Sequence, residues 1–138
     1  MSGVSAPSGA MTTTILLVED DPLAAQSILS LLSGGFGEVK RAAGAAEALC
    51  AIEQSEIAAK LGLVISGHHT TGIGGPAFVA ELHERMPELP VLVLGGDEES
   101  AADYAGEHVE FLPRRHASQQ IVPLARKMLA RENLPVTR

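Results

Sequence analysis

The 138-residue sequence is poor in aromatic and basic side chains. Aromatic residues make up 3% of it, tryptophan is absent, and 10 Lys and Arg are outnumbered by 17 Asp and Glu, for a formal net charge of −7. General nucleic-acid binding requires a basic surface and often uses aromatic side chains that stack on bases. The composition therefore argues against a nucleic-acid-binding module.

Cysteine and long apolar runs are also scarce. The single Cys50 excludes an internal disulfide and suits a reducing compartment, and we expect it to be a small buried side chain on a helix. The sequence contains no apolar run near the roughly 20 residues that cross a bilayer, and its first ten residues lack the basic and apolar regions of a signal peptide. These features predict a cytoplasmic protein that is not held in a membrane.

Hydrophobic residues make up 46% of the sequence, which is enough to form one core in a chain of this length. We expect residues 1–12 to be a disordered leader, residues 13–133 one domain and residues 134–138 a tail. Within the domain, short apolar runs alternate with segments of helical periodicity, a pattern typical of parallel sheets with crossover helices. The predicted strands are residues 15–18, 38–42, 61–66, 91–94 and 109–112.

Four segments have clear helical periodicity, and the short acidic segment 97–104 is predicted as a further helix. The first helix follows Asp21 and Pro22, which suit an N-cap and a first helical turn, and Ser33 with two glycines ends it. The predicted apolar faces contain Ala24, Ile28, Leu31 and Leu32; Ala45, Ala48, Leu49 and Ile52; Val79, Leu82 and Met86; and Ile121, Leu124, Ala125, Met128 and Leu129.

Candidate functional residues follow the predicted strands, because ligands of open parallel sheets bind at the carboxyl ends of the strands. The first strand leads to an acidic cluster, the third to a glycine and two histidines, the fourth to a glycine and the fifth to an arginine. In order, these residues are Glu19, Asp20 and Asp21; Gly67, His68 and His69; Gly95; and Arg114.

Four segments in this order resemble the receiver domain of bacterial two-component response regulators and hybrid histidine kinases. They are LLVEDDP at 16–22, LVIS at 63–66, LPVLVL at 89–94 and FLPR at 111–114, and the resemblance covers about residues 13–130. It implies an α/β, flavodoxin-like (βα)5 fold, a three-layer sandwich whose five-stranded parallel sheet has the strand order 2-1-3-4-5.

The resemblance also implies a chemistry that this sequence only partly retains. In the family, an aspartate after the third strand accepts a phosphoryl group from a histidine kinase, and an acidic pair after the first strand helps to hold Mg²⁺. A Ser or Thr after the fourth strand and a Lys after the fifth bind the phosphoryl oxygens. Here the acidic pair is kept as Glu19 and Asp20, but Gly67, Gly95 and Arg114 occupy the other three positions.

These replacements predict a degenerate receiver that does not accept phosphate by the family mechanism, is not an enzyme and binds Mg²⁺ weakly or not at all. Phe111 matches the aromatic residue whose rotation accompanies activation, but its hydroxyl-bearing partner is missing. We expect the planar guanidinium of Arg114 to pair with Glu19 or Asp20 across the vacated pocket, in place of a metal ion. The alternative is that Arg114 points into solvent.

Two other functions remain open at this stage. A phosphoaccepting receiver would use Asp20 or Asp21 instead of the missing aspartate. A metal- or ligand-sensing domain would use His68 and His69, whose imidazoles beside Glu19 could bind zinc or nickel. The simpler interpretation of both histidines is that they are polar loop residues, because adjacent residues leaving a strand point in opposite directions.

The charge pattern suggests how such a domain would act. Residues 97–110 carry six acidic and no basic side chains, whereas residues 114–131 carry five Lys and Arg and no acid. We predict a phosphorelay signalling domain, freestanding or part of a larger kinase or regulator, that works by protein–protein interaction. Its partner would be a histidine kinase or another signalling protein, or a second copy bound through the faces of these two segments. Ordinary solvated faces are the alternative.

Overall fold

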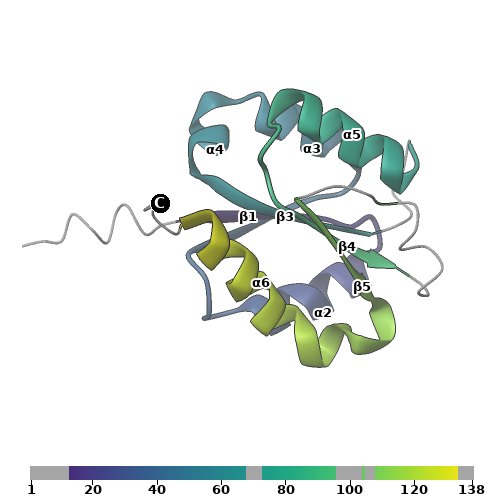
Figure 1. Ribbon diagram of the computed structural model, residues 1–138. Helices are drawn as coiled ribbons and strands as arrows, with labels where there is room; N and C mark the ends of the chain where they lie inside the picture. Colours follow the sequence, from purple (N-terminus) through teal and green to yellow (C-terminus); the bar gives the residue numbers. More distant parts are fainter. Residues whose placement is uncertain (1–12, 68–72, 96–103, 105–107, 134–138) are drawn as a thin grey trace, which may run out of the picture.

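A single parallel sheet organises the computed structural model, which describes residues 13–67, 73–95, 104 and 108–133 (Figure 1). Its strand order is β2-β1-β3-β4-β5, so the α/β fold and the 2-1-3-4-5 order predicted from the sequence are confirmed. The strands are β1 (Thr14–Val18), β2 (Glu38–Ala42), β3 (Leu61–Gly67), β4 (Val91–Gly95) and β5 (Val109–Pro113).

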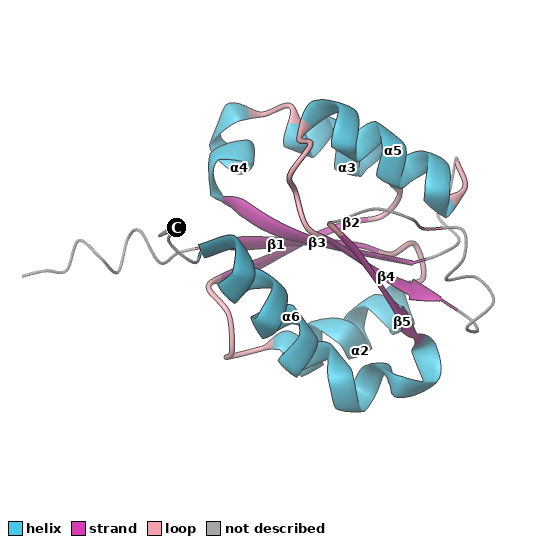
Figure 2. Cartoon of the chain, in the orientation of Figure 1, coloured by secondary structure: helices cyan, strands magenta, loops and turns pink. Residues whose placement is uncertain are grey.

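Helices cover both faces of this sheet, as Figure 2 shows: α3, α4 and α5 lie on one side, and α2 and α6 on the other. Their bounds are α2 (Pro22–Leu32), α3 (Ala45–Ile52), α4 (Ser55–Lys60), α5 (Gly75–Arg85) and α6 (Ala117–Asn133), with a 3₁₀ turn over Arg114–His116. The central strand β3 is buried along its whole length, as its continuous apolar sequence predicts. No helix in these ranges is long and apolar enough to span a bilayer.

Each face of the sheet has its own hydrophobic cluster, because successive side chains of a strand point to opposite faces. In β1, Leu16 and Val18 face α3 and α5, while Ile15 and Leu17 face α2 and α6. Phe78 of α5 is the largest side chain that is fully buried. The helices are thus held mainly by aliphatic packing, which explains how so few aromatic residues suffice.

Local signals set the ends of α2 as expected. The Asp21 carboxylate caps the helix by accepting a hydrogen bond of 3.1 Å from the backbone N–H of Leu23. Beyond the helix, Gly34 has a φ of 80°, a left-handed conformation that a glycine adopts without a steric penalty.

The apolar face of α2 differs from the predicted one. Its inward residues are Ala25, Ile28 and Leu32, whereas Ala24 is only half-buried and Leu31 is exposed.

Three further sequence expectations need correction. Cys50 is exposed on α3, because the inward positions of that helix are taken by Ala45, Ala48 and Ile52. Phe78 is absent from the predicted face of α5 but is fully buried, whereas Met86 follows the last residue of the helix and packs half-buried against the same core. The short helix α4 was not foreseen, because none of its residues is buried and it therefore has no apolar face to detect.

The beginning of β3 contains an irregularity at Gly62. The pairing with β1 shifts there, so that Thr14 is opposite Leu61 but Ile15 is opposite Leu63. A Cβ at Gly62 would overlap the Cγ2 methyl group of Thr13 and lie 3.0 Å from Cδ2 of Leu129. Glycine is therefore needed at this bulge because other side chains already occupy the space beside it.

We predict that Gly62→Ala lowers the free energy of unfolding by about 1–3 kcal/mol, through overpacking against Thr13 and Leu129. Denaturant unfolding measures this loss. Thr13→Ser removes the overlapping methyl group, so the same alanine should cost less in that background. An equal cost in both backgrounds would show that the contact with Thr13 is not the cause.

Candidate functional site

The carboxyl ends of the strands bring together most of the residues that the sequence singled out. Glu19 follows β1, Gly67 and Gly95 are the last residues of β3 and β4, and Arg114 follows β5. Glu19 and both glycines are buried. This end of the sheet, called the carboxyl edge below, therefore carries one buried carboxylate, that of Glu19, and two strands that end in a glycine.

The Glu19 carboxylate forms an ion pair with Arg114, as predicted. The distance from Nη2 of Arg114 to Oε1 of Glu19 is 2.9 Å, and the carboxylate is 6% exposed whereas the arginine side chain is 43% exposed. The second oxygen, Oε2, accepts a hydrogen bond of 3.3 Å from the backbone N–H of Asp21. A buried carboxylate is costly unless it is paired and hydrogen-bonded, and both conditions are met here.

The backbone of Glu19 is held by a second arginine. Arg41 of β2 donates two hydrogen bonds from Nε and Nη2 to the carbonyl oxygen of Glu19, at 3.0 and 2.9 Å. The Glu19 N–H donates in turn to the carbonyl of Ala42 at 3.0 Å. The residue is thus fixed through its main chain by β2 and through its side chain by Arg114.

At the end of β4, the ring of Phe111 occupies the space beside Gly95. A Cβ built on Gly95 would overlap Cζ and Cε1 of that ring and lie 3.1 Å from Cε2. Phe111 also stacks on Tyr104, with ring centroids 5.9 Å apart and an interplanar angle of 30°. The aromatic ring therefore fills the volume into which a Ser or Thr side chain would project.

The receiver resemblance implies a Mg²⁺ ion at this edge, but the described residues do not fit one. The position after β3 that would supply a carboxylate is Gly67. Both oxygens of Glu19 already have hydrogen-bond donors, one of them a guanidinium. The described part of the chain contains no group of three His, Cys, Asp or Glu side chains able to hold a metal ion.

The remaining candidates are placed in different ways. Asp20 and Asp21 lie exposed beside Glu19, and Asp21 caps α2. His68 and His69 lie outside the described residues, as does the predicted helix at 97–104, with the exception of Tyr104. The structure therefore bears on the acidic cluster and not on the histidine pair.

Two features of the site were missed at the sequence level. The role of Arg41 could have been suspected from its place near the end of a strand that the 2-1-3 order sets beside β1. The contact between Phe111 and Gly95 also had a signal, since an aromatic side chain on a neighbouring strand often covers a glycine. Phe111 is paired with Val93, two residues before Gly95 on the same face of the sheet.

Comparisons with known proteins place this architecture among receiver domains. No family model and no curated protein matches the sequence. A signal receiver domain of an HD-domain-containing protein from Pseudomonas fluorescens Pf-5 has 25% identity and a TM-score of 0.76, over 87% of this chain and 96% of that chain.

Two more solved structures agree with this assignment. A response regulator receiver domain protein from Clostridium thermocellum has 23% identity and a TM-score of 0.77, covering 87% of this chain and 96% of that one. A putative response regulator from Chloroflexus aurantiacus J-10-fl has 28% identity and a TM-score of 0.74, covering 86% and 98%. The chain thus has the fold of a receiver domain, and its likeness to response regulator receiver domains supports a place in two-component signalling.

Proposed function

We propose that this chain is a degenerate receiver domain of a cytoplasmic phosphorelay pathway, which acts by protein–protein contact and not by aspartate phosphorylation or another enzymatic activity. The observation that carries the proposal is the composition of the carboxyl edge. Gly67 stands where the phosphoacceptor would be, and Arg114 is bound to the retained Glu19. A partner would therefore bind a domain whose site is already neutralised.

Loss of the nucleophile and loss of the hydroxyl position support the same conclusion independently. A glycine at position 67 provides no oxygen for a covalent phosphoryl bond. Position 95 lacks the hydroxyl group. In addition, the Phe111 ring occupies the volume that a threonine side chain would need. Both of these changes, together with the lysine position at Arg114, would have to be reversed before the edge could bind a phosphoryl group in the family manner.

The acidic residues that remain are poorly suited to replace the acceptor. Asp21 is committed to the N-terminus of α2, where its carboxylate accepts the hydrogen bond from Leu23. Asp20 lies on the same exposed turn, at the end of β1 and not of β3. An acyl phosphate on either residue would lack the threonine and lysine positions that stabilise one in the family.

The surface of α2 supports a role in protein contact. Leu23 is 75% exposed and Leu31 is 36% exposed, so that two large apolar side chains of α2 are in contact with solvent. Leu31 lines a groove of about 240 Å³ between α2 and the start of α6, where Arg114 and Ala117 form the other wall. We propose that a partner signalling protein contacts α2 at this groove, next to the Glu19–Arg114 ion pair.

We predict that beryllofluoride or acetyl phosphate with Mg²⁺ leaves the amide NMR spectrum of the chain unchanged. The physical reason is that β3 ends in a glycine and not in an aspartate, and that both carboxylate oxygens of Glu19 already accept hydrogen bonds. Intact-mass measurement after acetyl phosphate treatment should show no phosphate adduct. A stable adduct on Asp20 or Asp21, or saturable shifts around Glu19, would overturn the proposal.

The matched variant for this experiment is the triple substitution Gly67→Asp, Gly95→Thr and Arg114→Lys. It replaces every missing group of the family site and should therefore gain Mg²⁺-dependent shifts with beryllofluoride. A triple variant that folds, as judged by its amide dispersion, but gains no such shifts would count against the assignment of these positions.

The Gly95–Phe111 contact generates its own prediction. Gly95→Thr should lower the free energy of unfolding by about 1–3 kcal/mol, because its Cβ overlaps the phenyl ring. In a Phe111→Ala background the same threonine should cost clearly less, so that the two changes couple in a double-mutant cycle. Gly74→Thr is a suitable control, since nothing lies within 4 Å of a Cβ at that position. Additive effects would contradict the contact.

The ion pair also generates a prediction about stability. Arg114→Gln should lower the free energy of unfolding by about 1–2 kcal/mol, because it leaves the buried Glu19 carboxylate without its cation, while the arginine side of the pair is partly screened by solvent. Adding Glu19→Gln should recover part of that loss. Lys127→Gln, on an exposed position of α6, is the control and should change little. If Arg114→Gln leaves the free energy of unfolding unchanged, the ion pair does not stabilise the domain.

A further inference from the structure

The two helical layers that cover the sheet carry opposite charges, with histidine counted as neutral. On one side, residues 45–60 and 75–88, which include α3, α4 and α5, contain six acidic and two basic side chains, for a net charge of −4. On the other side, residues 22–32 and 114–130, which include α2 and most of α6, contain four basic and no acidic side chains, for a net charge of +4. The domain is therefore polarised across its sheet, although the whole chain has an excess of acidic residues.

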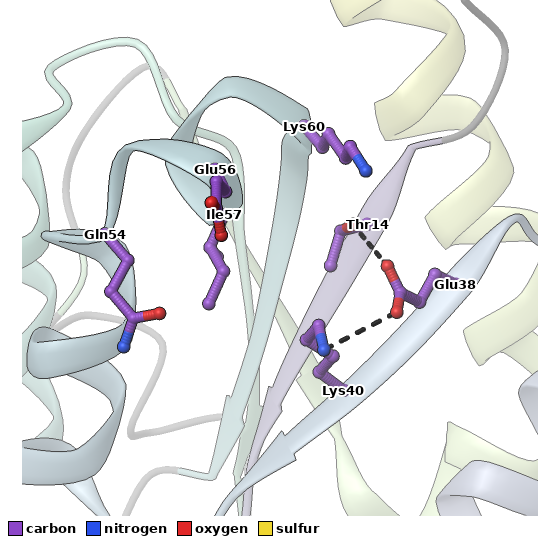
Figure 3. Close-up of a pocket in the computed structure, with 7 residues that line it drawn as sticks. All are labelled: Thr14, Glu38, Lys40, Gln54, Glu56, Ile57 and Lys60. Carbon is purple, nitrogen blue, oxygen red and sulfur yellow. Dashed lines mark hydrogen bonds and ion pairs between the residues drawn. The ribbon is translucent and has the colours of Figure 1, made fainter. Parts of the chain in front are cut away.

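The two basic side chains of the acidic layer are directed to groups of their own domain. Arg85 is engaged within the layer, because its Nε lies 3.2 Å from the carboxylate of Glu53 and its Nη1 lies 2.7 Å from that of Glu81. Figure 3 shows that the Lys60 side chain extends toward Thr14 of β1, at the edge of the sheet. The outer surface of α5 therefore keeps its negative charge.

Each layer also presents charges that have no ion-pair partner in the described part of the chain. On the acidic layer these are Glu84, in the last turn of α5, and Glu88, shortly after it, both of which are exposed. On the basic layer, Lys127 is exposed and has no carboxylate partner. Arg126 lies over the ring of Phe36, 5.5 Å from its centroid. This contact fixes the position of the guanidinium without neutralising its charge.

These charges lie toward the same end of the sheet, the amino edge, at which the parallel strands begin. The helix α5 connects the end of β3 to the start of β4, so its last turn lies at this edge. The second half of α6 lies there too, because Leu129 borders Gly62 near the start of β3. A second copy that is placed against this one with its strands in the same direction would thus bring Lys127 of one copy close to Glu84 of the other.

We propose that copies of this chain bind one another head to tail, with the α2–α6 layer of one copy against the α3–α5 layer of the next. A two-fold dimer through either layer would place like charges in contact, whereas the head-to-tail arrangement pairs opposite charges. Each copy keeps one free layer, so the product is an open row of copies. Leu23 and Leu31 of α2, which are 75% and 36% exposed, would supply apolar contact within this interface.

This inference goes beyond the proposed function, because it holds whether or not the carboxyl edge accepts phosphate. It is tested by sedimentation velocity of the full chain at about 10–500 μM. In about 20 mM NaCl we expect the weight-average sedimentation coefficient to rise with protein concentration beyond the value of a dimer. In about 500 mM NaCl the rise should be lost, since the Debye length falls from roughly 20 to roughly 4 Å. A chain that sediments as a monomer at the highest concentration in low salt would overturn the proposal and leave the beryllofluoride experiment unaffected.

Charge reversals test which layers meet. Lys127→Glu on the basic layer and Glu84→Lys on the acidic layer should each weaken self-association about fivefold or more, the effect of losing one exposed ion pair. Lys60→Glu is the matched control, because it changes the net charge as Lys127→Glu does but adds to the acidic layer. It should therefore not weaken self-association. All three positions are exposed, so the variants should keep the parent fold. Unchanged or stronger association of Glu84→Lys, which makes the chain less acidic, would show that net charge and not the paired layers controls association.

An equimolar mixture of the two weakened variants tests the head-to-tail arrangement itself. The Lys127→Glu chain retains its acidic layer and the Glu84→Lys chain retains its basic layer. The mixture should therefore form a 1:1 dimer, and nothing larger, at concentrations at which each variant alone is monomeric. Both substitutions in one chain should recover part of the open association, because the exchanged charges again attract each other across the interface. A mixture that associates no more than its two components would contradict the proposal.

Discussion

The buried carboxylate of Glu19 is the constraint on which the carboxyl edge of this domain depends. A charged group that is 6% exposed must be compensated, and here a guanidinium and a backbone N–H provide the compensation. In a receiver of the usual kind the resemblance implies that a bound cation has this role. Arg114 supplies one positive charge from within the chain, and this charge does not depend on the concentration of a metal ion. The charge of Glu19 is therefore compensated by groups of the chain itself.

A second constraint is steric and concerns the end of β4. With no side chain at Gly95, the strand end would leave a void, and voids in a packed interior forfeit dispersion contacts. The ring of Phe111 fills this space and is supported from its other side by Tyr104. The position of Phe111 is consequently explained by packing alone. A residue larger than glycine at position 95 would require this ring to shift.

Local signals in the sequence predicted the alternation of strands and helices, whereas the strand order and the pairing of Arg114 with Glu19 or Asp20 were expected from the resemblance to receiver domains. Several features can be identified directly from the sequence: the apolar run of β3, the Asp21 cap and the charged residues at the strand ends. The sequence did not predict which residues of a helix point into the core. The inward face of α2 was displaced to Ala25, and Cys50 was wrongly expected to be buried, because helical periodicity fixes an apolar stripe only to within about one residue. The short helix α4 has no buried residue and therefore lacks the periodic apolar residues by which a helix is recognised in a sequence.

The replacements at the carboxyl edge are best understood as one unit and not as a series of separate losses. An aspartate at position 67 would add a second negative charge close to Glu19, whose present partner is a single arginine. A threonine at position 95 would meet the Phe111 ring, and a lysine at position 114 would exchange a planar fork for a point charge on a more flexible stem. The first two reversals thus conflict with groups that are present in the structure, the Glu19 carboxylate and the Phe111 ring. The Glu19–Arg114 ion pair and the packing of Phe111 at Gly95 are thus the two interactions at the strand ends on which the proposed function rests.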